Sequence, residues 1–126
     1  MKYNLNKLKE FINNELSKVK FNQSTKGFKY LEEAIFICVI NDDAIDNLSK
    51  NVFPKIANEH NEKTSFNVKW CIEQIINTMY NNTDGNILCQ NYNLEINSKP
   101  TLKHIIYTIL CKCYRHKNEL RTWAGD

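Results

Sequence analysis

Residues 48–82 carry the most informative pattern in the chain, LSKNVFPKIANEHNEKTSFNVKWCIEQIINTMYNN. Its second part has apolar residues three or four positions apart, the spacing that places side chains on one face of a helix. A polar break at 61–63 precedes this stripe, and Thr64 or Ser65 can cap the helix that follows. The pattern predicts a chain reversal around 60–65 and a long amphipathic helix that buries Val68, Ile72, Ile75, Ile76 and Met79.

The first part of the stretch has helical spacing that is interrupted by a proline. Its apolar positions run from Leu48 to Ala57, with Pro54 between them. Because proline is tolerated in a first helical turn but kinks a helix interior, the helix either begins near Asn51 or bends there. A helix, a short break and a longer helix form a helix-turn-helix, which can present its second helix to the DNA major groove. The alternative is a helical hairpin with a purely structural role, whose two helices only pack within the fold.

Before this unit, helical spacing predicts two more helices. One apolar stripe runs from Leu5 to Val19, and the other covers residues 31–38. Gly27 is expected to separate them, and the polar residues 41–43 are expected to end the second helix.

After the unit, Asp84 and Gly85 are expected to close the long helix, and a short helix is expected at 87–89. Pro100 and Thr101 have the chemistry of a helix start and precede a last apolar stripe. We therefore predict an all-α fold with five to six helices around a helix-turn-helix at about 48–82. Residues 1–126 are expected to form a single helical domain.

Composition agrees with this fold class. The chain has 126 residues, of which 42% are hydrophobic, but only 3 Gly and 2 Pro, which argues against a turn-rich β-fold.

No apolar run approaches a membrane span, so we expect a cytoplasmic protein. The net charge is +3, with basic ends at 1–29 and 99–126 around an acidic middle at 30–62. This distribution fits either a nucleic-acid footprint or ordinary solvated helix faces.

The sequence offers no catalytic or metal-binding motif. The 5 cysteines do not have zinc-site spacing, and we interpret them as reduced, apolar core side chains without metal. Adjacent acids, as in Asp42-Asp43, diverge on a helix rather than converge. His60 falls where a helix should end, which favours a cationic ring. We therefore predict that the protein is not an enzyme and needs no cofactor.

Three motifs resemble a known family when read in order. KGFKYLEEAI at 26–35 is similar to the K-G-[YF]-x-Y-L-x-E-A-I of the C-terminal DNA-binding effector domain of the master sporulation response regulator, stage 0 sporulation protein A. FPKIA at 53–57 falls on the family's Y-P-x-I-A, followed by Asn61 on its turn. KPT at 99–101 matches the opening of the family's last helix. The resemblance covers roughly residues 12–116 and implies an all-helical DNA-binding fold.

The chain departs from the family in two respects. The family's effector domain follows a phosphorylated receiver domain, and this chain begins too late to hold one, so control by aspartyl phosphorylation in cis is not expected. The recognition helix also differs, because Asn67, Trp70 and Glu73 stand where the family carries Arg, and Gln74 stands where it carries His. Arg is the commonest reader of guanine, so the family's sequence preference does not carry over.

Our first hypothesis is a standalone, sporulation-effector-like transcription regulator that binds double-stranded DNA with a diverged recognition helix. Asn67, Gln74 and Asn77 would pair with adenine, and Lys69 would contact a phosphate or guanine. The groove-facing set is Asn67, Lys69, Trp70, Glu73, Gln74 and Asn77, and the candidate phosphate contacts are Lys50, Lys55, Lys63 and Lys99.

The second hypothesis is a protein-interaction module that modulates a full-length sporulation regulator or polymerase without strong DNA reading. Trp70 supports it, because a Trp off the apolar stripe can mark an interface. A homodimer, or a heterodimer with the full-length regulator, stays open, as do the target sequence and the sign of regulation. Trp123 is expected to be loosely packed near the chain end.

Overall fold

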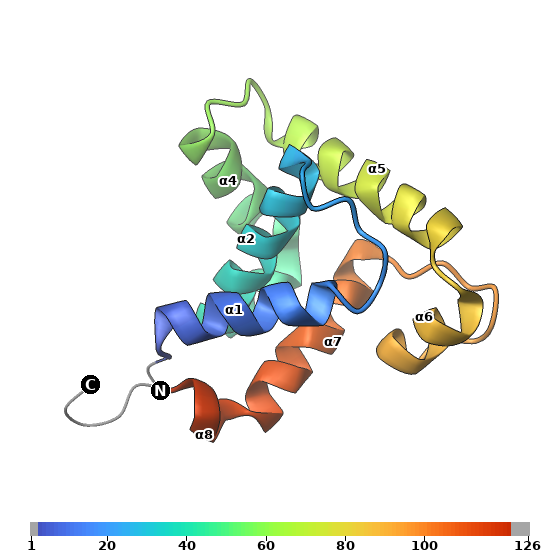
Figure 1. Cartoon of the computed structure of the whole chain (residues 1–126). Helices are drawn as coiled ribbons and strands as arrows, with labels where there is room; N and C mark the ends of the chain where they lie inside the picture. Colours follow the sequence, from blue (N-terminus) through green and yellow to red (C-terminus); the bar gives the residue numbers. More distant parts are fainter. Residues whose placement is uncertain (1–2, 122–126) are drawn as a thin grey trace.

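The structure, a computed structural model, describes residues 3–121 and is all-helical over that range, and the prediction for Trp123 lies outside the described residues. Within it the only β-type pairing is an isolated bridge between Tyr3 and Arg121. In chain order (Figure 1), the elements are α1 (Leu5–Leu16), α2 (Lys26–Ile40), the 3-10 helix η1 (Asp42–Asn47), α3 (Leu48–Asn51), α4 (Phe53–Glu59), α5 (Ser65–Asn82), α6 (Gly85–Tyr92), α7 (Leu102–Arg115) and α8 (Lys117–Leu120).

The all-α prediction is confirmed, but the expected count of five to six helices is too low. The additional elements are short, since α3 and α8 have four residues each and η1 has six. An apolar stripe becomes visible only over several turns, so elements of this length leave no periodic signal.

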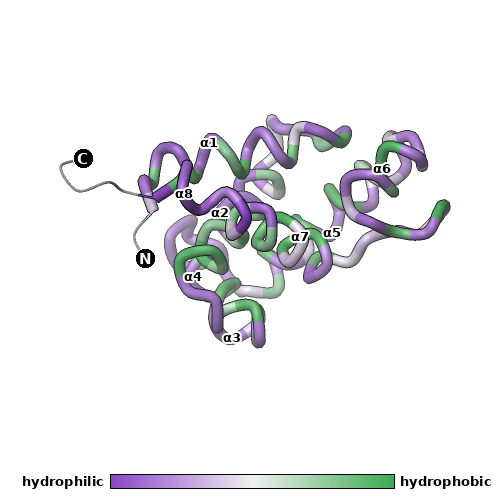
Figure 2. Tube along the Cα trace, turned by 90° about the horizontal axis from the view of Figure 1, so that it is seen from below, coloured by the Kyte–Doolittle hydropathy of each residue, from purple (hydrophilic) through white to green (hydrophobic). Residues whose placement is uncertain are grey.

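The core is built around α2, which packs against α1, α4, α5, α7 and η1. In Figure 2, α2 and α7 lie in the middle, with α1 on one side and α3 and α4 on the other. The predicted stripe of α2 is buried and extends further, to Phe28 and Val39. Gly27 does not separate two helices as expected. It is the second residue of α2, is buried, and faces α5.

The buried residues of α1 differ from the predicted apolar stripe at both ends of the helix. Leu8, Ile12 and Leu16 are buried, whereas Leu5 in the first turn is 51% exposed. Val19 is buried as predicted, but it lies in the loop after the helix. The stripe is therefore shorter than the run of apolar residues that suggested it.

The proline-containing segment breaks at Val52, where one short helix ends and α4 begins with Pro54 in its first turn. Proline has no backbone N–H to continue a helix, so the chain restarts there. Asp84 and Gly85 start α6 rather than simply closing α5, because the Asp84 carboxylate accepts the backbone N–H groups of Asn86 and Ile87. The expected short helix is correspondingly longer, Gly85–Tyr92.

Two of the five cysteines are fully buried. Burial raises the pKa of the Cys38 thiol to about 11. Burial, followed by the nearby Glu15 charge, raises that of Cys113 to about 12. All five side chains are free thiols in the structure. Protonated, buried thiols behave as small apolar groups, which fits the interpretation from sequence for Cys38 and Cys113, whereas the other three cysteines are only half-buried.

Candidate nucleic-acid interface

The turn between α4 and α5 is set by local chemistry. Asn61 has φ 55°, a left-handed conformation that asparagine tolerates better than most residues. It lets the Glu62 N–H donate to the Ala57 carbonyl at 2.9 Å, which closes the end of α4. The Thr64 hydroxyl then accepts the Asn67 N–H at 3.2 Å and starts α5. The predicted reversal at 60–65 is confirmed.

Replacing Thr64 with Ala is expected to lower the free energy of unfolding by about 1 kcal/mol, because the first turn of α5 loses its cap. Thr64→Ser keeps the accepting hydroxyl and should retain most of the stability. Urea unfolding followed by circular dichroism measures both variants. An alanine variant as stable as the wild type would contradict a capping role.

The inner face of α5 holds the helix against the core. All five residues of the predicted stripe are buried, and α5 packs mainly on α2 and α4. The side chains on the opposite side are consequently turned away from the core. We call this the outer face and define it by the exposed residues Phe66, Asn67, Trp70, Glu73 and Gln74.

Four predicted groove-facing residues lie on the outer face, and Trp70 is 53% exposed. Lys69 and Asn77 are only half-buried and lie at its margins. Phe66 was missed in the sequence analysis, although at 66% exposed it projects further than Trp70. Its position off the apolar stripe was the available signal, the same one that singled out Trp70.

A shallow groove of about 330 Å³ runs beside the outer face. Lys69 and Glu73 line it from α5, Asp46 and Asn47 from η1, and Lys103 from the start of α7. Lys103 was not among the residues expected from sequence. The fold therefore places a basic side chain from α7 near the lysine of α5.

The four lysines predicted to contact phosphate are all exposed, but they lie on different elements. Lys63 is in the turn before α5, Lys50 on α3 and Lys55 on α4. Lys99 comes from the loop before α7, and its ammonium group donates a hydrogen bond to Asn77 Oδ1. Asn77 Oδ1 keeps a second lone pair, so it can still accept from adenine, but the bond to Lys99 restricts how its amide group can be oriented.

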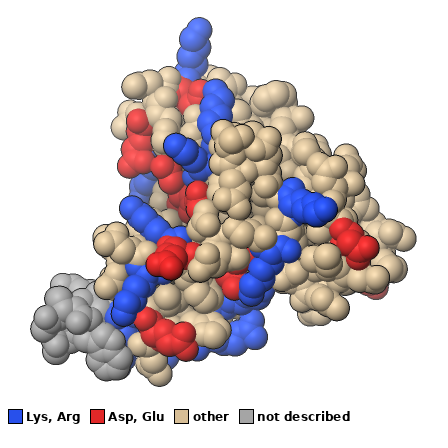
Figure 3. Space-filling view, viewed as in Figure 1, with Lys and Arg blue, Asp and Glu red and all other residues tan. Residues whose placement is uncertain are grey.

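The charge around α5 is mixed rather than uniformly basic. The helix itself carries one Lys and one Glu. On the face of the molecule seen in Figure 3, basic and acidic side chains are interspersed, and much of the surface is uncharged. Electrostatic attraction to a polyanion therefore has to come from individual lysines rather than from a continuous positive surface.

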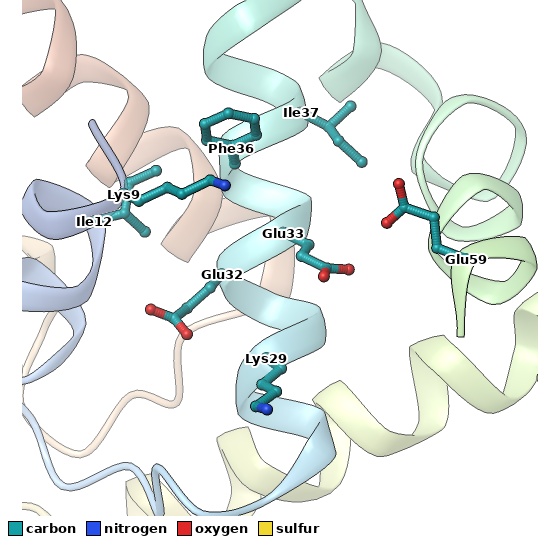
Figure 4. Close-up of a pocket in the computed structure, with 8 residues that line it drawn as sticks. All are labelled: Lys9, Ile12, Lys29, Glu32, Glu33, Phe36, Ile37 and Glu59. Carbon is teal, nitrogen blue, oxygen red and sulfur yellow. The ribbon is translucent and has the colours of Figure 1, made fainter. Parts of the chain in front are cut away.

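A second hollow, of about 460 Å³, lies between α1, α2 and α4 and includes no residue of α5 (Figure 4). At its edge, the ligand atoms of Glu33, Glu59 and His60 lie within 4.8 Å of one another. His60 Nε2 is 2.9 Å from both carboxylate oxygens of Glu33, so these two side chains already partner each other. We interpret this group as a surface contact between α2 and the end of α4.

A short helix, a turn and a longer helix with a free outer face are the elements of the helix-turn-helix class of DNA-binding proteins. Residues 12–113 match the family described as sporulation initiation factor Spo0A C terminal, and the chain belongs to that family. This confirms the resemblance inferred from the three motifs. The family is one of DNA-binding regulatory domains and not of enzymes.

No curated protein matches the chain. None of the helices at residues 3–121 is long and apolar enough to cross a membrane.

Proposed function

We propose that the chain is a transcription regulator of the sporulation-effector type that binds duplex DNA by placing α5 in the major groove. The observation that carries the proposal is the outer face of α5, which stands free while the inner face is anchored on α2 and α4. In this proposal, the 126-residue chain binds DNA on its own, as a standalone regulator. Its affinity for DNA comes mainly from lysines that contact phosphates. Its preference for particular bases comes from side chains other than Arg.

Binding is expected to be weak and steeply dependent on salt. Each neutralised phosphate contributes about −0.9 to the slope of log affinity against log salt concentration. If Lys50, Lys55, Lys63 and Lys99 each neutralise one phosphate, the slope will be roughly −3 to −4. Fluorescence anisotropy with a labelled duplex at several salt concentrations measures it.

Lys63→Ala provides the matched test of the phosphate contacts. It should weaken binding to all duplexes alike and reduce the slope by about one. Lys7→Ala removes an exposed lysine from α1 and should leave the slope unchanged. Equal effects of the two variants would show that the lysines act only through net charge.

The exposed aromatic side chains of α5 favour a second candidate function. An exposed Trp is the kind of side chain that anchors protein interfaces, so the outer face would instead bind a full-length sporulation regulator or polymerase. Such a module would show no DNA binding even at low salt. Its binding to the protein partner would also be unaffected by the loss of the Lys63 side chain.

A further inference from the structure

The most distinctive feature of the outer face is a pair of exposed aromatic rings at its N-terminal end. Phe66 is 66% exposed and Trp70 53% exposed, and they are one helical turn apart. Residues four apart on a helix lie on the same face, so the rings form one apolar strip. Within residues 3–121, neither ring stacks on another aromatic ring or on a cation.

The surroundings of this pair suit a nucleic acid better than an apolar protein surface. Asn67 and Gln74 are exposed beside the rings, and Lys63 and Lys69 lie close in sequence on the turn and on the helix. The core of a protein–protein interface is depleted of charged residues. Phosphates on either side of a groove, by contrast, require lysines flanking the side chains that reach the bases.

Apart from Glu73, whose carboxylate suits a cytosine amino group, the side chains of the outer face match A·T base pairs on both strands. In the major groove, adenine is read by the amides of Asn and Gln, and thymine is distinguished by its C5 methyl, which apolar side chains such as Phe contact. Guanine is read by Arg or Lys. Helix α5 contains no Arg, and its one lysine, Lys69, is half-buried at the margin of the outer face. The N-terminal residues of a recognition helix are the ones that reach base edges, and Phe66 and Trp70 lie in its first two turns.

We propose that Phe66 and Trp70 determine specificity by contacting thymine methyl groups, so that the preferred target is rich in A·T pairs. This rests on the proposed function, since it requires α5 to enter the major groove. It assigns the aromatic rings to base reading and the lysines to phosphate binding.

The test compares two duplexes that differ only in the thymine methyl. One is an alternating dA·dT duplex, and the other carries deoxyuridine in place of every thymidine, which leaves all hydrogen-bonding groups unchanged. Burying one methyl is worth about fourfold in affinity. With one or two methyls buried, wild-type protein should bind the thymine duplex about four- to sixteen-fold more tightly.

Variants assign the discrimination to the rings. Phe66→Ala and Trp70→Ala should each bring the thymine-to-uracil affinity ratio closer to one, with unchanged thermal unfolding because both rings are exposed. Tyr114→Ala removes a ring of α7 that is 63% exposed and should keep the wild-type ratio.

The outcomes separate this inference from the proposed function. A wild-type ratio of one, with salt-sensitive binding to both duplexes, overturns methyl reading and leaves DNA binding supported. A ratio above one that neither ring variant changes overturns the assignment to Phe66 and Trp70. Binding to neither duplex at low salt overturns both proposals and indicates that the rings face a protein partner.

Discussion

Replacing Gly27 with Ala is expected to lower the free energy of unfolding by about 1–3 kcal/mol, the usual cost of overpacking a core. A Cβ at this position would lie 2.5 Å from the Cys71 carbonyl oxygen and 3.0 Å from Ile75 Cγ2. The first neighbour is backbone, so α2 and α5 would have to move apart. This cost outweighs the better helix propensity of alanine, because α2 and α5 share the largest interface of the core.

Gly85→Ala is the matched control for this substitution. A Cβ there would meet only Ile96 Cγ1, at an ordinary contact distance of 3.6 Å. This variant should be as stable as wild type or more stable by up to about 1 kcal/mol. Chemical unfolding of the three proteins measures the difference. Equal stability of Gly27→Ala and Gly85→Ala would show that α2 and α5 are not packed this closely.

Replacing Glu73 with Arg is expected to tighten binding to a duplex that presents guanine to α5 by about 10- to 100-fold, the range of a good bidentate contact from Arg to guanine. Glu73 is exposed on the outer face and forms no ion pair within residues 3–121. In the proposed binding mode, the wild-type carboxylate repels phosphates unless it meets a cytosine amino group. The Arg variant removes this repulsion and adds the donor fork that the family resemblance implies for this position.

Two further variants separate these contributions. Glu73→Gln removes only the repulsion, so its affinity should lie between those of wild type and Glu73→Arg. Glu10→Arg makes the same change in net charge on an exposed position of α1, and we expect it to have a much smaller effect because salt screens distant charges. An equal gain from Glu10→Arg would contradict a groove-facing position for Glu73. Anisotropy titrations at one salt concentration measure all three.

The candidate interface was predictable from sequence to the extent that it depends on one helix. Apolar residues at helical spacing bury one side of α5, and the remaining positions must then face outward. Asn67, Trp70, Glu73 and Gln74, which the family resemblance singled out, also satisfy this reasoning, and the structure confirms that they are exposed. The exposure of Phe66 follows from the same reasoning, because this residue also stands off the apolar stripe.

The helical class, the reversal at 60–65 and the two faces of α5 follow from the sequence, because they depend on contacts between residues a few positions apart. The remaining features arise only when the helices pack together. It brings Lys99 to Asn77 and Lys103 to the groove beside Lys69, and it presses Gly27 against the backbone of Cys71. The members of each pair are far apart in the chain, so the local spacing of apolar residues cannot predict that they meet. They are fixed only when burying the apolar faces of α2, α5 and α7 together sets the position of each helix.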